Sequence, residues 1–262
     1  MPSVLHRRIL RAMVTVAAVL IGDEILSGEV EETNSRVLVE TLRATGASLG
    51  RIVIIPDDPD EIAREVRHCS DAYEHVVTSG GVGPTHDDRT MEGVAKAFGR
   101  PIVRDPAIAT IIKRILKDGA NEAALTMADV PEGSHLIDAG AYPVVAYRNI
   151  YILPGIPEIF REKLGYLRER FSDAPTHVGR LFLGCYESVI ATELAAISRE
   201  RLGVTIGSYP RLSGEYRVQI TVKSQDVAAV EHALELLRER LPAEHLLRVC
   251  PPEVSSKDDQ AR

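Results

Sequence analysis

The sequence has no tryptophan, only three cysteines in 262 residues, and no hydrophobic run long enough to cross a membrane. Cys69, Cys185 and Cys250 lie far apart and form no C-x-x-C pair, which argues against a zinc site and against a disulfide framework. Cysteines that are few and widely spaced fit a reducing compartment. We therefore expect a cytoplasmic protein with no membrane partner.

Several catalytic motifs are also missing. No G-x-S-x-G or H-E-x-x-H pattern occurs, and no cysteine and histidine are spaced as a nucleophile pair, so the sequence does not support acyl transfer through a covalent nucleophile. The 31 Lys and Arg residues are outnumbered by 38 Asp and Glu, which gives a net charge of −7. Because this charge repels phosphate backbones, we expect no nucleic-acid partner, and a polyphosphate ligand would need a cation.

The start of the chain resembles a secretory signal only superficially. Basic residues precede the apolar run 14–21, but the run is short, meets Gly22-Asp23-Glu24 at once, and lacks a small-residue cleavage site. We interpret the run as a buried strand. Residues 1–12, which precede Met13, are interpreted as a flexible extension or the result of a misplaced start.

Apolar runs and helical patterns then alternate along the chain. The short apolar runs that predict strands are 14–21, 52–55, 75–78, 135–137, 144–147 and 151–153. Segments with helical spacing, bounded by glycine or proline, connect many of these runs. The alternation predicts an α/β domain over residues 13–171, with a mostly parallel sheet covered by helices on both faces.

A second, smaller domain is predicted after the linker-like segment 172–175. Strands are expected at 178–183, 205–209 and 216–222, and helices at 187–200 and 228–241. This order predicts a small α+β domain of split β-α-β type over residues 176–250. The polar residues that follow Pro251 predict a disordered tail over residues 251–262.

Polar loops follow several predicted strands and begin at Gly22, Asp57 and Gly80. Because the carboxyl ends of parallel strands share one edge of a sheet, where ligands bind, we expect these loops to converge. Gly155 lies in the turn that follows the predicted strand 151–153. Glu158 follows at the start of a helix, where a carboxylate is also an ordinary first-turn residue.

The loop 79–88 is the most informative segment. Gly80, Gly81 and Gly83 follow a strand and precede a helix, so backbone N–H groups there can approach an anion near the positive end of the helix. No G-K-[ST] follows, as a Walker A loop would require. His86 stands where the dinucleotide fingerprint has its last glycine. Alone, such a loop is either an anion cradle or a tight turn.

An acidic pair, Asp87 and Asp88, ends this loop. Two carboxylates beside an anion are unfavourable unless a divalent cation intervenes, and oxygen ligands suit Mg²⁺ or Mn²⁺. The alternative is that one of them caps the helix that begins at Thr90. Asp57 and Asp58 pose the same choice, because aspartate beside proline is ordinary turn chemistry.

Acidic residues also follow the first strand. Asp23 and Glu24 could serve a ligand or only a turn, and His86 could hydrogen-bond a phosphate or be an exposed loop residue. Acidic residues thus follow several strands at one edge of the predicted sheet, called the rim below. Together they favour a metal-assisted phosphate site.

Four segments carry a recognisable pattern: 22–28 (GDEILSG), 33–35 (TNS), 78–90 (TSGGVGPTHDDRT) and 153–158 (LPGIPE). They resemble the molybdopterin-binding-like domain of the CinA (competence/damage-inducible protein A) family. That domain is similar to the N-terminal half of eukaryotic FAD synthase and, more distantly, to bacterial molybdopterin adenylyltransferases. The resemblance implies an α/β three-layer sandwich with a ligand site at the glycine-rich loop.

One departure separates the sequence from the adenylyltransferases. Their acidic site residues correspond by position to Asp57 and Asp88, but Asp87 stands where they carry arginine. The resemblance therefore favours the CinA group, whose stand-alone members resemble metal-dependent pyrophosphatases acting on ADP-ribose or FAD-like dinucleotides. CinA itself carries a further nicotinamide-nucleotide deamidase domain, and we expect no deamidase activity here because the sequence ends before such a domain.

Our leading hypothesis is a metal-dependent nucleotide pyrophosphatase. Asp57 and Asp88 are expected to bind a divalent Mg, Mn or Co ion and, with Asp87, to serve catalysis. The residues expected to bind the substrate are Asp23, Asn34, Ser79, Gly80, Gly81, Gly83, Thr85, His86, Gly155 and Glu158. The alternatives are transferase or carrier chemistry on a pterin and a nucleotide-binding module without turnover. By analogy with the family, we also expect the protein to form a homo-oligomer.

Overall fold

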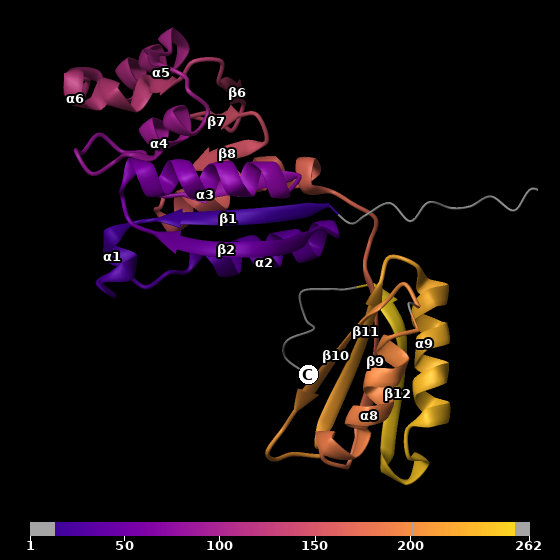
Figure 1. Cartoon of the computed structure of the whole chain (residues 1–262). Helices are drawn as coiled ribbons and strands as arrows, with labels where there is room; N and C mark the ends of the chain where they lie inside the picture. The colour runs from indigo at the N-terminus through magenta and orange to yellow at the C-terminus, as the bar shows by residue number, and fades with distance from the viewer. Residues whose placement is uncertain (1–13, 201, 255–262) are drawn as a thin grey trace, which may run out of the picture. The chain divides into compact units, whose positions relative to one another are not determined.

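The computed structural model describes residues 14–200 and 202–254 (Figure 1). The predicted extension 1–12 and residues 255–262 of the predicted tail lie outside the described residues. The chain separates into two compact units. Unit 1 ends at Asp173 and unit 2 begins at Ala174, inside the segment 172–175 that the sequence predicts as a linker.

Unit 1 alternates strands and helices for most of its length. Its strands are β1 (Thr15–Ile21), β2 (Ser48–Ile55), β3 (His75–Ser79), β4 (Ile102–Arg104), β5 (Asp129–Pro131), β6 (His135–Ile137), β7 (Val144–Tyr147) and β8 (Ile150–Leu153). Its helices are α1 (Asp23–Leu26), α2 (Asn34–Thr45), α3 (Pro59–Ala72), α4 (Thr90–Ala97), α5 (Pro106–Leu116), α6 (Glu122–Leu125) and α7 (Pro157–Leu167). Short 3-10 turns lie at Lys117–Gly119, Thr126–Ala128 and Arg168–Phe171.

The main sheet of unit 1 is mostly parallel, as predicted. Its strands lie in the order β2-β1-β3-β8-β7-β6. Strands β2, β1, β3 and β8 are parallel, β7 is antiparallel to β8, and β6 is antiparallel to β7. Successive side chains of a strand point to opposite faces. Val16, Ala18 and Leu20 of β1 therefore join one core, and Ala17 and Val19 join the other. Both faces of β1 are buried over residues 16–21, which explains why these residues are all apolar.

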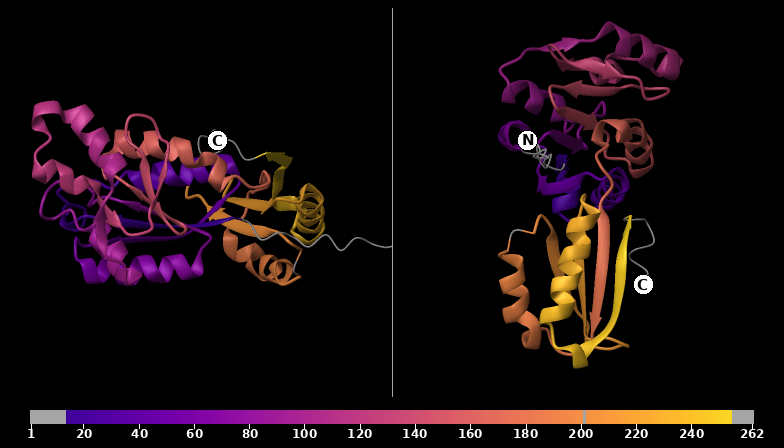
Figure 2. Two further views of the ribbon diagram at one scale, coloured as in Figure 1. Left: turned by 90° about the horizontal axis from the view of Figure 1, so that it is seen from above. Right: turned by 90° about the vertical axis from the view of Figure 1, so that its right-hand side faces the viewer.

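Helices cover both faces of this sheet. On one face, α3 and α5 contribute Ile62 and Ile108 to the core, and on the other, α2 and α7 contribute Leu38 and Phe160. The left view of Figure 2 shows the sheet between the two helical layers. The predicted three-layer α/β sandwich is confirmed.

Local sequence explains where these helices begin and end. The Asp58 side chain caps α3 by accepting hydrogen bonds from the N–H groups of Asp60 (2.8 Å) and Glu61 (3.0 Å). Pro59 takes the first helical position, where no N–H is needed. α2 ends at Gly46, which has a left-handed φ of 79°. No helix within the described ranges is long and apolar enough to span a bilayer.

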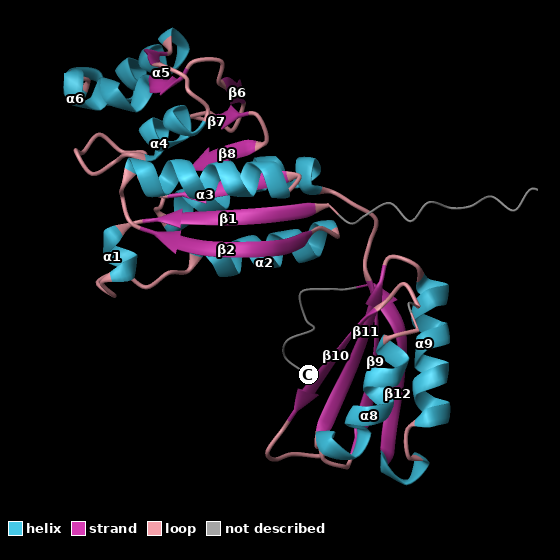
Figure 3. Ribbon diagram, in the orientation of Figure 1, coloured by secondary structure: helices cyan, strands magenta, loops and turns pink. Residues whose placement is uncertain are grey.

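Unit 2 is an antiparallel sheet with α8 and α9 on one face (Figure 3). Its elements are β9 (His177–Leu183), α8 (Glu187–Ser198), β10 (Thr205–Pro210), β11 (Val218–Ser224), α9 (Val227–Arg240), a 3-10 turn (Ala243–His245) and β12 (Leu246–Val254). The strand order is β10-β11-β9-β12, and each neighbouring pair is antiparallel. Because β11 lies between β9 and β10, which α8 connects, the predicted split β-α-β arrangement is confirmed.

The tail prediction is wrong for residues 251–254. These residues continue β12, which pairs with β9 and which the sequence analysis did not predict. The register of this pairing shifts between Cys250 and Glu253, around Pro251 and Pro252. Proline has no N–H to donate, so a strand tolerates it only at a sheet edge or a bulge, and β12 offers both.

Candidate functional site

The loops after β1, β2, β3 and β8 meet at the carboxyl edge of the parallel sheet. Gly22 donates a backbone hydrogen bond to the carbonyl of Ile55 (3.1 Å), and Gly80 donates one to the carbonyl of Leu153 (3.2 Å). The first bond ties the loop after β1 to the end of β2. The second ties residues 79–88, called the glycine loop below, to the end of β8. The structure therefore brings together polar loops that lie far apart in the sequence.

Two glycines of the glycine loop have left-handed backbone conformations, with φ of 104° at Gly80 and 62° at Gly81. A Cβ on Gly80 would lie 2.1 Å from the carbonyl oxygen of Ile21, so no other residue fits there without a shift of the backbone. Thr90, the first residue of α4, donates its N–H to the Gly81 carbonyl (3.0 Å) and its hydroxyl to the Gly80 carbonyl (2.8 Å). Both carbonyl oxygens are thus satisfied inside the protein.

Asp57 lies beside the glycine loop. Its Oδ2 accepts a hydrogen bond from the N–H of Asp23 (3.0 Å), and its Oδ1 lies 3.2 Å from the position that a Cβ on Gly81 would take. Burial raises the pKa of Asp57; the bond from Asp23 opposes this effect, and the carboxylates of Glu24, Asp23 and Asp87 add to it. Several carboxylates therefore act on Asp57, and a cation bound to Asp57 would offset their negative charge.

Asp58, the next residue, has a structural role. Its carboxylate caps α3, and the hydrogen bonds from the N–H groups of Glu61 and Asp60 lower the pKa of Asp58. The turn interpretation of the Asp57-Asp58 pair is therefore correct for Asp58.

Asp88 closes the glycine loop on itself. Its Oδ2 accepts hydrogen bonds from the N–H (2.8 Å) and the hydroxyl (2.5 Å) of Thr85. α4 has no side-chain cap, so the alternative that Asp87 or Asp88 caps this helix is wrong. The His86 side chain is fully exposed, and its Nδ1 lies 3.8 Å from Asp87 Oδ1.

Asn34 connects the start of α2 to two of the converging loops. Its Nδ2 donates to Ser79 Oγ (2.9 Å) and to the carbonyl of Gly155 (2.7 Å), while its buried Oδ1 has no partner among the described residues. Gly155 in turn packs on Gly80: a Cβ on Gly155 would lie 3.3 Å from the Cα of Gly80. Glu158 is exposed in the first turn of α7.

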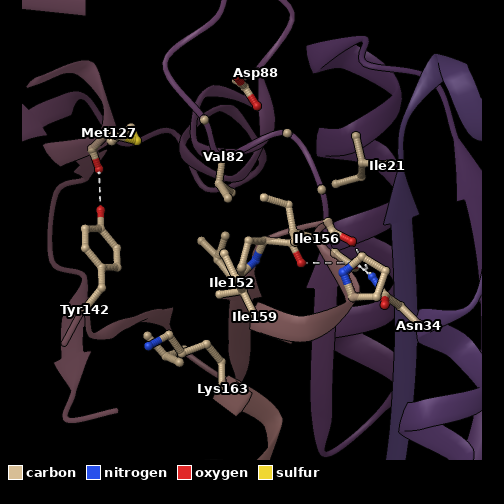
Figure 4. Close-up of a pocket in the computed structure, with 18 of the residues that line it drawn as sticks. Ile21, Asn34, Val82, Asp88, Met127, Tyr142, Ile152, Ile156, Ile159 and Lys163 are labelled. Carbon is tan, nitrogen blue, oxygen red and sulfur yellow. Dashed lines mark hydrogen bonds between the residues drawn. The ribbon is translucent and has the colours of Figure 1, made fainter. Parts of the chain in front are cut away.

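A cavity of about 810 Å³ opens beneath the glycine loop (Figure 4). Its walls are mostly apolar and come from strand ends, α4, α5, α7 and the segment before β7. The wall residues include Ile21, Val82, Met91, Ile112, Met127, Tyr142, Val144, Ile152, Ile156 and Ile159. Such walls suit a flat ring. The sequence analysis missed the cavity, because in the sequence these residues are indistinguishable from core residues.

The cavity divides the predicted site residues into two sets. Those that line it are Asn34, Ser79, Gly80, Gly81, Gly83, Asp88 and Gly155. Those that do not line it are Asp23, Asp57, Thr85, His86, Asp87 and Glu158. In the part of the chain that the structure describes, no group of three or more His, Cys, Asp or Glu is arranged to hold a metal ion. A metal shared by Asp57 and Asp88 stays a prediction.

Tyr142 fixes one wall of the cavity. Its hydroxyl donates to the carbonyl of Met127 (3.0 Å), as Figure 4 shows. Burial, with a smaller contribution from the charge of Asp105, raises the pKa of Tyr142 to about 12. The native state therefore keeps this phenol neutral at a pH where an unfolded chain would ionise it.

We expect this shift to appear in the stability of the protein at alkaline pH. The raised pKa gives a contribution that is complete below about pH 10 and is lost as pH rises to about 12. Tyr142→Phe removes that contribution and the bond to Met127, so it starts less stable and the gap to the wild type narrows above pH 10. Thermal unfolding of both proteins at a series of pH values measures this; a gap that stays constant would contradict the assignment.

Comparison with known families agrees with this architecture. Residues 17–169 match the family model described as a probable molybdopterin binding domain. The chain belongs to this family. Residues 175–249 match a second model, described as the middle domain of FAD synthase. The two matched segments fall in unit 1 and unit 2.

Individual relatives narrow the assignment to the CinA type. A protein of Archaeoglobus fulgidus is 33% identical over 223 residues, which are 84% of this chain and 95% of the relative. The crystal structure of the protein CinA from Thermoplasma acidophilum is 30% identical with a TM-score of 0.55, and covers 61% of this chain and 99% of that one. The resemblance to CinA is therefore confirmed.

A third relative is longer than this chain. The probable FAD synthase of Caenorhabditis elegans is 32% identical over 259 residues, which are 87% of this chain. The chain spans about half the length of that relative. Both units of this CinA-type chain thus have counterparts within one larger protein.

Proposed function

We propose that this chain is a metal-dependent hydrolase of nucleotide diphosphates, with ADP-ribose or an FAD-like dinucleotide as substrate. A probable FAD synthase among its relatives and the molybdopterin-binding description of its family support a ligand that combines phosphate with a heterocycle. The cavity supports the same view, since a cleft with apolar walls beside a glycine-rich loop accommodates both parts.

The observation that carries the proposal is the position of Asp57 beside Gly81. An oxygen of this carboxylate lies 3.2 Å from the Cβ position of a glycine in a loop suited to phosphate, and burial, with smaller contributions from neighbouring carboxylates, raises the pKa of Asp57. A carboxylate and a diphosphate repel each other unless a cation joins them. A group that serves only structure would more commonly be placed as Asp58 is.

Carboxylate oxygens, which follow β2 and β3 here, are a ligand type that suits a divalent metal ion. Asp57 and Asp88 are the proposed ligands, and Mg²⁺ usually keeps several waters beside one or two carboxylates and substrate phosphates. When bound, Mg²⁺, Mn²⁺ or Co²⁺ supplies charge that offsets the diphosphate and lowers the pKa of a bound water. We also propose that Asp87 serves catalysis from the exposed side of the loop.

The protein's own groups position the substrate. Backbone N–H groups of the glycine loop, with Ser79, hydrogen-bond the diphosphate as negative charge develops on it. Thr85 holds Asp88 in place through its N–H and its hydroxyl. Asn34 ties Ser79, at the start of the glycine loop, to the Gly155 turn through its two Nδ2 hydrogen bonds. Attack by water forms one P–O bond and breaks the bridging P–O bond, and the products are two phosphomonoesters.

A second candidate function is binding or adenylyl transfer on a pterin, which the description of the matched family favours. A third is a nucleotide-binding module without turnover. Retention of a fluorescent pterin during mild purification would favour the second, and equal nucleotide binding with and without metal, and no product, would favour the third.

Removal of metal is expected to abolish turnover. The purified protein, incubated with ADP-ribose or FAD and with Mg²⁺, Mn²⁺ or Co²⁺, should release AMP, and a chelator should reduce the rate to background because the diphosphate then lacks its counter-charge. Chromatography of the products measures this, and re-addition of the metal is the control. A rate that the chelator leaves unchanged, or no AMP with any metal, would rule out the proposed function.

A further inference from the structure

Lys163 is a charged residue that the proposed chemistry does not use. It lies on the buried face of α7, is 5% exposed, and lines the cavity. Its Nζ donates to the carbonyl of Ala139 (2.7 Å) and to Oε1 of the neighbouring Glu162 (3.1 Å). An ammonium has three N–H bonds, and the described residues supply partners for two.

One N–H of this lysine remains for a further partner among ligand groups. A buried cation is unfavourable unless it is hydrogen-bonded and paired. The Glu162 side chain, which also lines the cavity, is 54% exposed, so the pair is open to the cavity rather than sealed in the core. Lys163 thus brings a charged donor, and Glu162 a charged acceptor, to the same part of the cavity wall.

Lys163 lies away from the glycine loop. In Figure 4, Asp88 is near the top and Lys163 is lower in the view, with Ile152 and Ile159 between them. Tyr142 stands at the side, held by its bond to Met127. A ligand whose diphosphate meets the glycine loop would extend its ring between these apolar walls toward Lys163 and Glu162.

The chemistry of the pair restricts what the ring presents. A second phosphate is disfavoured because the Glu162 carboxylate would repel it. A neutral edge that carries a carbonyl beside an N–H matches both groups, since Lys163 donates to the carbonyl and Glu162 accepts from the N–H. We propose, on the basis of the proposed function, that Lys163 and Glu162 select a ligand by the lactam edge of its heterocycle.

Matched flavin probes test this selection. FMN carries a lactam edge, and its N3-methyl derivative keeps the ring, side chain and phosphate but lacks the N–H. The wild type should bind FMN about 10- to 100-fold more tightly than the methyl derivative, as expected for one hydrogen bond to a charged group. Titration followed by the fluorescence of the isoalloxazine ring measures both affinities.

Two variants separate the roles of the pair. Lys163→Met, which keeps the apolar stem, should weaken FMN binding about 10- to 100-fold. Glu162→Ala should remove the discrimination between the two probes. Lys113→Met, at an exposed position on α5, is the matched control and should bind like the wild type. Because Glu162→Ala leaves the buried Lys163 without its carboxylate partner, the melting temperature of this variant is measured first. If neither variant folds, the comparison of the two probes in the wild type still decides whether the lactam N–H is recognised.

Several results would overturn the inference. The first is no FMN binding by the wild type, and the second is equal binding of the two probes. The third is unchanged FMN binding by Lys163→Met with only a lower melting temperature, which would mean that Lys163 serves only to connect α7 to Ala139. Loss of ADP binding alone in that variant would assign the pair to adenine instead. If the protein hydrolyses the dinucleotide but binds the two probes equally, the proposed function stands and this inference fails. If it distinguishes the two probes but hydrolyses no dinucleotide, this inference stands and the proposed function fails.

Discussion

Asp57→Asn is expected to lower kcat/KM for hydrolysis of ADP-ribose or FAD about 100- to 1000-fold, the usual effect of losing one group that stabilises charge in the transition state. Asparagine keeps the shape of the side chain, and its oxygen can still accept the bond from the N–H of Asp23. The variant also loses the repulsion among the rim carboxylates, so its fold should be at least as stable as the wild type. Steady-state kinetics over a range of metal concentrations measures the effect.

The neighbouring aspartate supplies a matched control. Asp58→Ala removes the cap of α3 and should lower the melting temperature modestly, while kcat/KM stays close to the wild-type value. The pair distinguishes loss of chemistry from loss of structure at adjacent positions. Equal loss of turnover in both variants, or full activity of Asp57→Asn, would show that Asp57 has no direct part in the reaction.

Gly80→Ala is expected to have the largest effect on stability, about 3–5 kcal/mol. The new Cβ would lie 2.1 Å from the carbonyl oxygen of Ile21, which is backbone of the central strand β1 and cannot move aside cheaply. The φ of 104° adds strain for any residue with a side chain. Denaturant unfolding of the purified variant measures the loss, and nucleotide binding should weaken with it.

Gly28→Ala separates the two causes. Gly28 has a similar left-handed φ of 78°, but a Cβ there would meet nothing within 4 Å. This variant should lose only the conformational part, about 1–2 kcal/mol. If Gly80→Ala were no worse than Gly28→Ala, the close approach of the glycine loop to β1 would not be a determinant of the fold.

Local pattern was sufficient for the strands of the main sheet of unit 1 and for the helix ends that a single residue decides, but it missed the short strands β4 and β5. The apolar run of β1 predicts a strand buried on both faces, and its alternate residues do enter the two cores of unit 1. Pattern failed at β12, whose consecutive prolines argue against a strand. An edge position and a bulge, which only the pairing with β9 reveals, make those prolines acceptable.

Sequence pattern is also insufficient to assign roles to the two acidic pairs of the candidate site. Both Asp57-Asp58 and Asp87-Asp88 precede helices, so composition does not tell a cap from a ligand. α3 begins at Pro59, which makes Asp58 its cap, whereas Asp88 bonds back to Thr85 and leaves α4 uncapped. The difference depends on where each backbone turns, which the three-dimensional path of the chain decides.

Sequence pattern alone predicts the α/β class of unit 1, the split arrangement of unit 2, and the edge of the sheet where polar loops converge. Periodicity and strand direction are local properties, and a parallel sheet leaves its strand ends on one side. The folded chain is needed to see that apolar residues of α5, α7 and the segment before β7 enclose a cavity, and that Lys163 lines it. A cavity wall and a core differ only in what lies opposite, and that depends on residues distant in the chain.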